Sequence, residues 1–575
     1  ARAPKSPWAG DRVSRSFPTS AQGGLREGGT PAWIRTPAGK CFTWYHAPAP
    51  GKARSCAVLL CDPFGWHRMV LHGAYRQLAL RLASEGFPVL RIDYPGTCDS
   101  EGHPRDLGRV QMWLDALDCG ADHLRERSGA ERLALFGALL GGTLAMLLSA
   151  RRPDVAGVAL WGPYSQGRLM VRTELAAAAM HVAAKQQAPG FVEGDHEAFG
   201  FLLTAPMIED LRAIDLMSVR PAALREALVL PRAGGSGDKR LAEHLSAEGA
   251  AVAFVAAPPE DLDGVLHENG AGHAPATLGQ VAGWLAERFP ERAEGPAPAH
   301  LAGAETDLAI AAPGGGVRET PVVIGPGSLF GILSEPRDRA PRLPAVVLVN
   351  GGHNHRSGIN RNYTEWARRL AARGHAVLRM DLRGLGDSPP ATPEGLARLY
   401  TTEGTRDVID AVAWLRERGY ERVCCAGLCA GGSQAFQAAL KSPSVDAIVM
   451  LNPLRFHADR ADAPAAKGIR GLARKIARRL PPALRAWGGA ERRIAASFAE
   501  LTARGVDVLI VYNANERYRE FLEGALHGIR RQLAAGGRFR LRIVGASDHI
   551  FSPLWAQAEA GDVLEEHMER LSQLR

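Results

Sequence analysis

The sequence is poor in cysteine and has no long apolar stretch. No apolar run of about eighteen residues occurs, so no membrane-spanning helix is expected. The eight cysteines have no disulfide-framework spacing, and several lie inside apolar, strand-like runs, which indicates a reducing compartment. Zinc-finger spacing and RNA-binding aromatic motifs are also missing. We therefore expect a cytoplasmic protein that does not bind nucleic acid.

The remaining composition is that of an ordinary soluble globular protein. The net charge of +8 comes from dispersed residues of both signs, so it is a modest basic bias only. A chain of 575 residues is too long for one hydrophobic core and predicts several domains. Residues 1–30 are rich in Arg, Ser and Gly without an apolar signal core, and we expect a disordered tail there.

The sequence repeats itself once at the scale of a domain. The apolar run Cys56–Asp62 resembles Pro344–Asn350, and Pro88–Asp93 resembles Ala376–Asp381. A helical pattern separates the two runs in each half, and further strands and helices alternate after them. This alternation predicts βαβ units and a mainly parallel sheet. We therefore expect an α/β protein with two tandem domains of similar fold, each with a helical cap.

The domain boundary falls in a segment rich in Ala, Pro and Gly. Such a composition is typical of a linker, which we place at residues 296–314. The first domain is then expected at residues 31–295 and the second at residues 315–575.

One short stretch of the second domain carries the strongest chemical signal. The apolar run Val423–Ala426 predicts a strand and Gly432–Leu440 a helix, with Gly427-Leu-Cys429-Ala-Gly431 between them. This is the strand–turn–helix context of a nucleophile elbow, with cysteine where serine is usual. A thiol at the start of a helix lies in a positive field that favours the thiolate. The alternative is a glycine-rich turn with an inert, buried cysteine.

The equivalent turn of the first domain has lost its nucleophile. It reads Gly137-Ala-Leu139-Leu-Gly141, which keeps the glycines and places Leu139 at the nucleophile position. Leucine has no nucleophilic atom, so this elbow cannot perform acyl chemistry. We expect the first domain to be a degenerate partner that serves as scaffold or pocket wall.

The partners of Cys429 are expected on loops that follow later strands. His549 follows the last predicted strand, at the place where this fold needs a base. The third member should follow the strand Val506–Tyr512, where both Glu516 and Asn515 are available. Glu516 would stabilise the imidazolium, and Asn515 would orient the ring without charge. The sequence leaves this choice open.

An oxyanion hole requires two backbone N–H groups. One is expected from Ala430, directly after the nucleophile, and the other from the loop that contains Gly352 and His353. His355 in the same loop is a candidate substrate contact. An H-x-H pair alone is a weak metal signal, so no metal and no cofactor are expected.

A basic segment interrupts the second domain at residues 455–498. Apolar residues recur at helical spacing between many arginines, Arg474 and Arg478 among them. A solvated basic surface explains this pattern as well as a cap over the Cys429 pocket. As a cap, Arg474 and Arg478 would contact the substrate's anionic carrier, such as an acidic carrier protein or coenzyme A.

Nearly the whole chain resembles the α/β-hydrolase superfamily. In the second domain, the matching segments include Arg379–Ser388, Gly427–Cys429, Leu451–Pro453 and Asp548–Ser552. Together they resemble the first type of exosortase A system-associated hydrolase. The first domain resembles the second type more loosely, through Asp62–Phe64 and Leu160–Pro163. The resemblance implies a cysteine at the second elbow and an acyl substrate.

The site residues favour a cysteine-dependent acyl transfer. Cys429 would attack an ester or thioester and pass the acyl group to water, an amine or an alcohol, as a thioesterase, acyltransferase or cyclase does. The alternatives are a lactone or ester hydrolase of the dienelactone-hydrolase type, and a module that binds an acyl chain without catalysis. The sequence does not indicate an oligomeric state.

Overall fold

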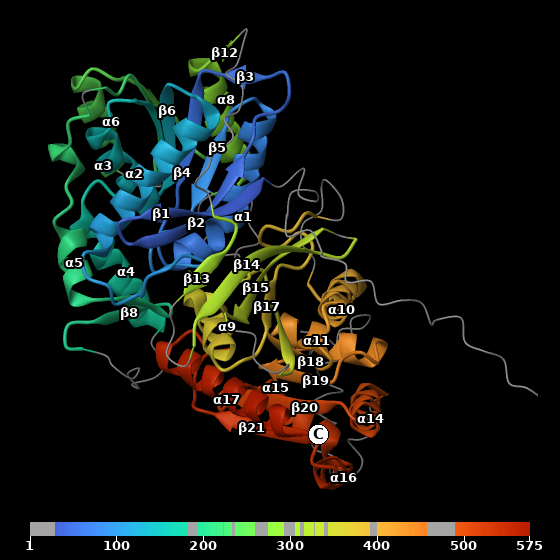
Figure 1. Cartoon of the computed structure of the whole chain (residues 1–575). Coiled ribbons are helices and arrows are strands. Elements are labelled where there is room, and N and C mark those ends of the chain that lie inside the picture. The colour runs from blue at the N-terminus through green and yellow to red at the C-terminus, as the bar shows by residue number, and fades with distance from the viewer. Residues whose placement is uncertain are drawn as a thin grey trace, which may run out of the picture.

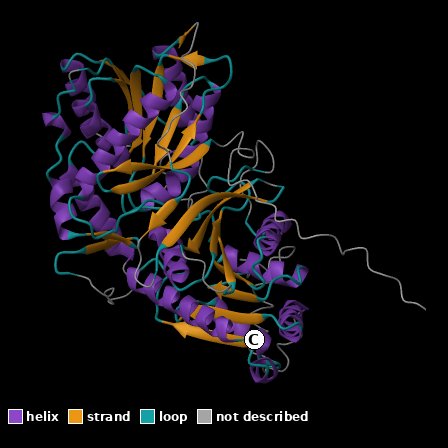
Figure 2. Ribbon diagram, in the orientation of Figure 1, coloured by secondary structure: helices purple, strands orange, loops and turns teal. Residues whose placement is uncertain are grey.

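The chain folds into two lobes, each built on one sheet with flanking helices (Figure 1; Figure 2). This structure is a computed structural model, which describes residues 29–181, 192–221, 223–232, 236–258, 261, 274–292, 305–310, 315–326, 328–337, 343–390, 399–456 and 489–574. The predicted α/β architecture with two tandem domains is confirmed. In the described part of the chain, no helix is both long and apolar enough to cross a membrane.

The first sheet has the strand order β1-β2-β5-β4-β6-β7-β10-β11. Pairs β1–β2 and β2–β5 are antiparallel, and the pairs from β5 to β11 are parallel. Its strands are β1 (Thr30–Thr36), β2 (Gly39–His46), β4 (Cys56–Cys61), β5 (Val89–Ile92), β6 (Arg132–Ala138), β7 (Val155–Trp161), β10 (Glu226–Leu230) and β11 (Ala251–Phe254). Its main helices are α1 (Trp66–Ser84), α2 (Arg109–Ser128), α3 (Leu140–Arg151), α6 (Ser236–Ala247) and α8 (Pro275–Arg288).

Smaller elements complete the first domain. The insertion after β7 contains α4 (Gly167–His181), the hairpin β8 (His196–Ala198) and β9 (Phe201–Leu203), α5 (Ala205–Arg212) and η2 (Leu216–Ser218). A second two-stranded sheet pairs β3 (Ala53–Arg54) with β12 (Glu291–Arg292).

The second sheet has the order β13-β14-β15-β17-β16-β18-β19-β20-β21. Its strands are β13 (Leu308–Ile310), β14 (Val317–Ile324), β15 (Leu329–Pro336), β16 (Ala345–Val349), β17 (Val377–Met380), β18 (Val423–Leu428), β19 (Ala447–Leu451), β20 (Asp507–Asn513) and β21 (Phe539–Val544). Its helices are η3 (Ile359–Arg361), α9 (Asn362–Ala372), α10 (Thr402–Glu417), α11 (Ala430–Lys441), α14 (Gly489–Ala503), α15 (Tyr518–Leu526), α16 (Arg530–Ala535) and α17 (Leu554–Gln573).

The central strands are apolar on both faces because helices cover both sides of the sheet. Every residue of β16 and β18 is buried, as expected for parallel strands inside an α/β domain. The strands run parallel from β17 to β21 and therefore end at one edge. Cys429, Asn513 and the loop after β21 meet at this edge.

The second sheet begins earlier than the sequence predicts. Residues 308–310 lie within the predicted linker 296–314, yet they form β13 and pair with β14. Leu308 is fully buried in an apolar cluster shared by both domains. The short run Leu308–Ile310 thus packs against an apolar surface. The Ala/Pro/Gly-rich sequence around it gives no sign of this packing.

The two domains meet through a reciprocal interface. Arg91 of β5 donates to Asp387 at 2.6 Å, and the equivalent Arg379 of β17 donates to Asp99, the equivalent of Asp387. Phe42 and Phe330, which also occupy equivalent positions, lie 6.4 Å apart between ring centroids. The repeated segments therefore pack against each other in a pseudo-twofold arrangement, as identical subunits do in a symmetric dimer.

Candidate active site

Cys429 occupies a sharp turn between β18 and α11. Its φ of 52° and ψ of −111° are strained for a residue with a side chain. A Cβ on Gly427 would lie 2.4 Å from the carbonyl carbon of Gly431, and a Cβ on Gly431 would lie 2.4 Å from the oxygen of Val349. Only glycine fits at both positions, so the flanking glycines permit the tight turn that holds the thiol above the sheet.

Leu139 occupies the same turn in the first domain. It has φ 53° and ψ −122°, and its side chain is buried in the core of that domain. A Cβ on Gly137 would lie 2.3 Å from Gly141, so the steric requirement of the turn is retained. The first domain keeps the elbow geometry but holds an apolar side chain there.

Glu516 contacts the candidate base. Nδ1 of His549 lies 2.7 Å from Oε2 of Glu516. Asn515 instead donates through Nδ2 to the oxygen of Ser547 at 3.3 Å, and its N–H donates to Oδ1 of Asn513 at 2.9 Å. Of the two candidates that the sequence left open, Glu516 is the residue that holds the imidazole.

His549 and Cys429 each shift the pKa of the other in the direction that favours a thiolate and an imidazolium. Burial raises the pKa of the Cys429 thiol, but the hydrogen bond and charge of His549 outweigh it, so the pKa is lowered. Burial lowers the pKa of His549, while the bonds to Cys429 and Glu516 raise it to about 10. In the described part of the chain, Nε2 of His549 is buried and makes no hydrogen bond of ordinary geometry.

Tyr400 is a site residue that the sequence did not indicate. Tyr400 lies just before the start of α10, and its Oη is 3.4 Å from Sγ of Cys429. The guanidinium of Arg455 lies over its ring at 4.8 Å. The N-cap residue Thr401 marks the start of a helix, but no sequence pattern directs the preceding tyrosine to the elbow.

The candidate oxyanion-hole groups lie at the carboxyl ends of β16 and β18. The backbone N–H of Ala430, directly after Cys429, helps to lower the pKa of the Cys429 thiol. In the loop after β16, Gly352 is half-buried with φ 61°, and His353 is half-buried beside it. Asn350 steadies this loop, because its Nδ2 donates to the oxygen of Asn354 at 2.8 Å and to Asp381 at 3.0 Å.

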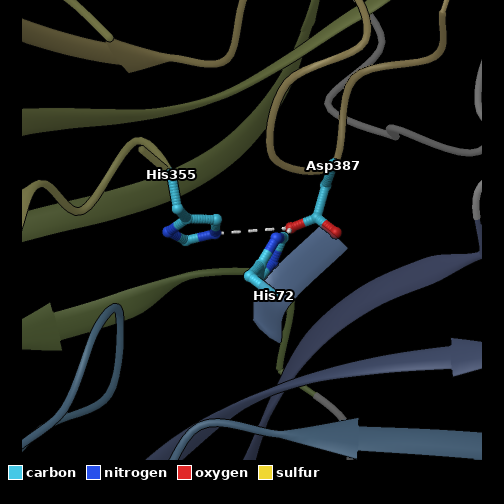
Figure 3. Close-up of side chains that lie close together, drawn as sticks. All are labelled: His72, His355 and Asp387. Atoms are coloured by element: carbon cyan, nitrogen blue, oxygen red, sulfur yellow. Dashed lines mark ion pairs between the residues drawn. The ribbon is translucent and has the colours of Figure 1, made fainter. Parts of the chain in front are cut away.

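His355 is directed to the domain interface (Figure 3). It is buried, its Nε2 lies 3.5 Å from Asp387, and its ring centroid lies 4.4 Å from that of His72 in the first domain. Its Nδ1 lies 3.0 Å from the hydroxyl of Ser357. The structure thus places His355 against His72 of the first domain and Asp387 and Ser357 of its own domain, in place of the substrate contact that the sequence suggested.

The group His72, His355 and Asp387 has the donor atoms of a metal site, but cations already neutralise it. Asp387 accepts hydrogen bonds from Arg91 at 2.6 Å and from Arg356 at 2.8 Å. Nη1 of Arg91 also lies 3.5 Å from Nε2 of His72. A divalent cation would face two guanidinium groups at close range, so we assign no metal to this cluster.

A small cavity also lies between the domains. Its volume is about 30 Å³, room for about two water molecules. Asp62, Phe64 and Arg68 of the first domain and His355 and Arg361 of the second are among its lining residues. Cys429 and His549 do not line it, so this cavity is separate from the thiol site.

The first domain contacts the start of α17, which follows the loop that carries His549. Oε1 of Glu197 in β8 accepts from the N–H of Leu554 at 3.2 Å, and the oxygen of Gly200 accepts from Gln557 at 3.3 Å. Met69 packs against the same apolar cluster as Cys429. The first domain is therefore part of the surroundings of the thiol site.

Most of the predicted basic cap, residues 455–498, lies outside the described residues, and Arg474 and Arg478 are among those not described. The described parts are Arg455, Phe456 and residues 489–498, which belong to α14.

Each half of the chain matches a family of α/β hydrolases. Residues 57–220 match the family described as serine aminopeptidase, S33, and residues 344–492 match the family described as alpha/beta hydrolase fold. No curated relative matches the chain.

Several solved structures resemble one half of the chain. The esterase Est22 is 17% identical over 45% of this chain and 81% of its own, with a TM-score of 0.31. A dienelactone hydrolase from Anabaena variabilis is 15% identical over 46% of this chain and 99% of its own, with a TM-score of 0.29. These values are too low to indicate a substrate or a mechanism. The two family matches and the two sheets together identify the chain as two tandem α/β-hydrolase domains.

Proposed function

We propose that the second domain catalyses acyl transfer from an ester or a thioester through an acyl-enzyme on Cys429. The observation that carries the proposal is a cysteine at a strained elbow, facing an imidazole whose Nδ1 lies 2.7 Å from Glu516. A pair of this kind supplies a nucleophile and its proton carrier in one arrangement. A cysteine with a purely structural role needs neither a strained elbow nor an imidazole partner.

The proposed reaction has two halves, acylation and deacylation, and Cys429 and His549 act in both. The thiolate of Cys429 attacks the acyl carbon, and the imidazolium of His549 then gives its proton to the leaving group. Glu516 holds the ring and stabilises its charged form. Water, an amine or an alcohol next loses a proton to His549 as it attacks the thioester, and Cys429 is restored. A thioester reacts readily with amines, which favours transfer over hydrolysis.

The negative oxygen of the tetrahedral intermediate needs hydrogen-bond donors. We assign the backbone N–H of Ala430 as one donor and the loop with Gly352 and His353 as the source of another. The glycine at position 352 leaves space for a substrate oxygen, since a Cβ there would meet no atom within 4 Å.

The first domain is proposed to have no acyl chemistry of its own, because Leu139 cannot act as a nucleophile. The resemblance to exosortase A system-associated hydrolases extends this proposal to an acyl substrate of a biosynthetic pathway. Arg474 and Arg478 of the basic segment remain candidate contacts for an acidic carrier protein or coenzyme A.

Lactone or ester hydrolysis of the dienelactone-hydrolase type is the alternative, since that chemistry also uses an elbow cysteine. It differs in the acceptor, which is then always water. The second alternative, an acyl-binding module without catalysis, predicts no covalent adduct.

Intact mass spectrometry separates these possibilities. The full chain is incubated with a panel of acyl thioesters, aryl esters and lactones, with and without an added amine. We expect an acyl adduct on the wild-type protein that an amine releases as an amide, and no adduct on Cys429→Ala. Adducts that only water releases would favour the hydrolase. An adduct that persists in Cys429→Ala, or no adduct with any acyl donor, would contradict the proposal.

A further inference from the structure

Tyr400 has an unusual backbone conformation next to the reactive sulfur. Its φ of +61° lies in the left-handed region, which is rare for a bulky residue and marks a position that its surroundings hold in place. Its Oη lies 3.4 Å from Sγ of Cys429, within hydrogen-bond distance for sulfur. This combination of strain and contact is typical of a functional position.

The neighbour of Tyr400 is tied to the helix that begins at the elbow. The oxygen of Thr401 accepts from Nε2 of Gln434 in α11 at 3.1 Å, and Oε1 of Gln434 accepts from Thr405 at 2.6 Å. The hydroxyl of Thr401 also caps α10. The guanidinium of Arg455 lies over the Tyr400 ring, 4.8 Å from its centroid. The phenol is therefore positioned from the same helix as the nucleophile.

The phenol is the donor of this hydrogen bond when Cys429 is a thiolate. Burial raises the pKa of Tyr400, and the negative charge of the Cys429 sulfur raises it further, so the O–H keeps its proton at neutral pH. A protonated phenol next to a thiolate can only donate. The same bond lowers the pKa of Cys429.

We propose that Tyr400 is a catalytic residue of this site, whose phenol donates first to the thiolate of Cys429 and then to the oxyanion of the tetrahedral intermediate. This inference rests on the proposed function. When the C–S bond forms, the π electrons of the carbonyl move to its oxygen, and the negative charge leaves the sulfur. The sulfur of Cys429 and this oxygen are then bonded to the same carbon. The hydrogen bond of the Tyr400 phenol therefore moves from the sulfur to the oxygen. Collapse restores the carbonyl and breaks the bond to the leaving group, which takes the proton of His549.

The test measures the pKa of Cys429 and the rate of acylation in the full chain. Alkylation by iodoacetamide is followed against pH on the peptide that contains Cys429. The other seven cysteines have thiols whose pKa burial raises, which keeps them slow. Tyr400→Phe keeps the ring under Arg455 and removes only the O–H. We expect a higher pKa of Cys429 and acylation slower on the order of 10²-fold, as for one lost oxyanion donor.

Tyr420→Phe is the matched control, since it removes an O–H that donates to Glu335 at 2.6 Å. A Tyr400→Phe chain that behaves like this control in both measurements would overturn the proposal. A fluorinated tyrosine at position 400, a stronger donor of nearly the same shape, should lower the pKa of Cys429. An unchanged pKa there overturns the proposal even if Tyr400→Phe misfolds. Alkylation needs no substrate, so this result is independent of the adduct test on Cys429→Ala.

Discussion

The charge of Glu516 should control the reactivity of Cys429. Glu516→Gln removes a negative charge that helps to raise the pKa of His549, so the imidazolium weakens and the pKa of Cys429 rises. We expect the wild-type alkylation profile of Cys429 to lie at lower pH than that of a free cysteine. The Glu516→Gln profile should shift to higher pH, and turnover should fall toward the deficit on the order of 10²–10⁴-fold that loss of the base His549 itself would cause. Asn515→Ala should stay close to wild type in both measurements; a deficit as large as that of Glu516→Gln would give the orienting role to Asn515.

Single residues were predictable where their chemistry is tied to a local pattern. Cys429 lies between glycines that the turn requires, and His549 follows a strand with a clear apolar pattern. The choice between Glu516 and Asn515 depends on how the chain turns after Asn513, which accepts from the N–H of Asn515. Tyr400 reaches Cys429 only through the tertiary path of the segment before α10, so no local pattern marks it.

At the scale of elements, the hairpin of β8 and β9 should position the loop that carries His549. A Cβ on Gly200 would lie 2.1 Å from the backbone oxygen of Ser552, so Gly200→Ala must displace one of the two segments. We expect reduced turnover and a higher pKa of Cys429, because His549 moves with its loop. Gly249→Ala is the control, since Gly249 also has positive φ but would meet no atom within 4 Å. Equal effects of the two variants would limit the role of Gly200 to backbone strain.

Elements with strong apolar periodicity were predictable, whereas those that depend on the other domain were not. Residues 345–349 read as a buried strand because all five are apolar and flanked by turn signals. The three residues of β13 form a strand because Leu308 is buried beside Trp33 and Phe42 of the first domain. That partner surface exists only once the two halves have packed.

At the scale of the whole molecule, Arg356 should be essential for stability. It is fully buried and pairs with Asp99, Asp381 and Asp387, two of which lie on its own domain. Arg356→Met leaves three buried carboxylates with one cation fewer, and we expect a loss of about 3–5 kcal/mol in the free energy of unfolding. Arg81→Met, which breaks an exposed pair with Glu85, should change it by less than about 1 kcal/mol in urea unfolding. Similar losses in the two variants would contradict this reading of the interface.

The interface should also weaken in mild acid. His72 faces His355, Asp387, Arg68 and Arg91. Burial first, and then His355, Arg68 and Arg91, hold the pKa of His72 well below its usual value, while Asp387 acts in the opposite direction. The unfolded chain therefore binds a proton below about pH 6.5 that the folded chain does not, and the free energy of unfolding falls as pH decreases.

His72→Asn removes this group and should flatten the dependence between about pH 6.5 and 5 by up to about 1.4 kcal/mol per pH unit. The lowered pKa values of Asp99 and Asp387 act only at more acidic pH. The exposed His196→Asn serves as control. Chemical unfolding at several pH values measures the slopes, and parallel curves for His72→Asn and wild type would rule the idea out.

The reciprocal pairing of Arg91 with Asp387 and of Arg379 with Asp99 has a consequence for how the two halves can change with time. Each half supplies a carboxylate that neutralises an arginine of the other half. Either half alone would therefore have charged side chains without their partners. Loss of the nucleophile from the first elbow leaves Asp99 in place, and with it the neutralisation of Arg379 and Arg356. A gene that discarded the first half would leave these cations buried without their anion or exposed on an apolar surface. The first lobe can thus be retained as the obligatory ionic complement of the second, independently of any reaction of its own.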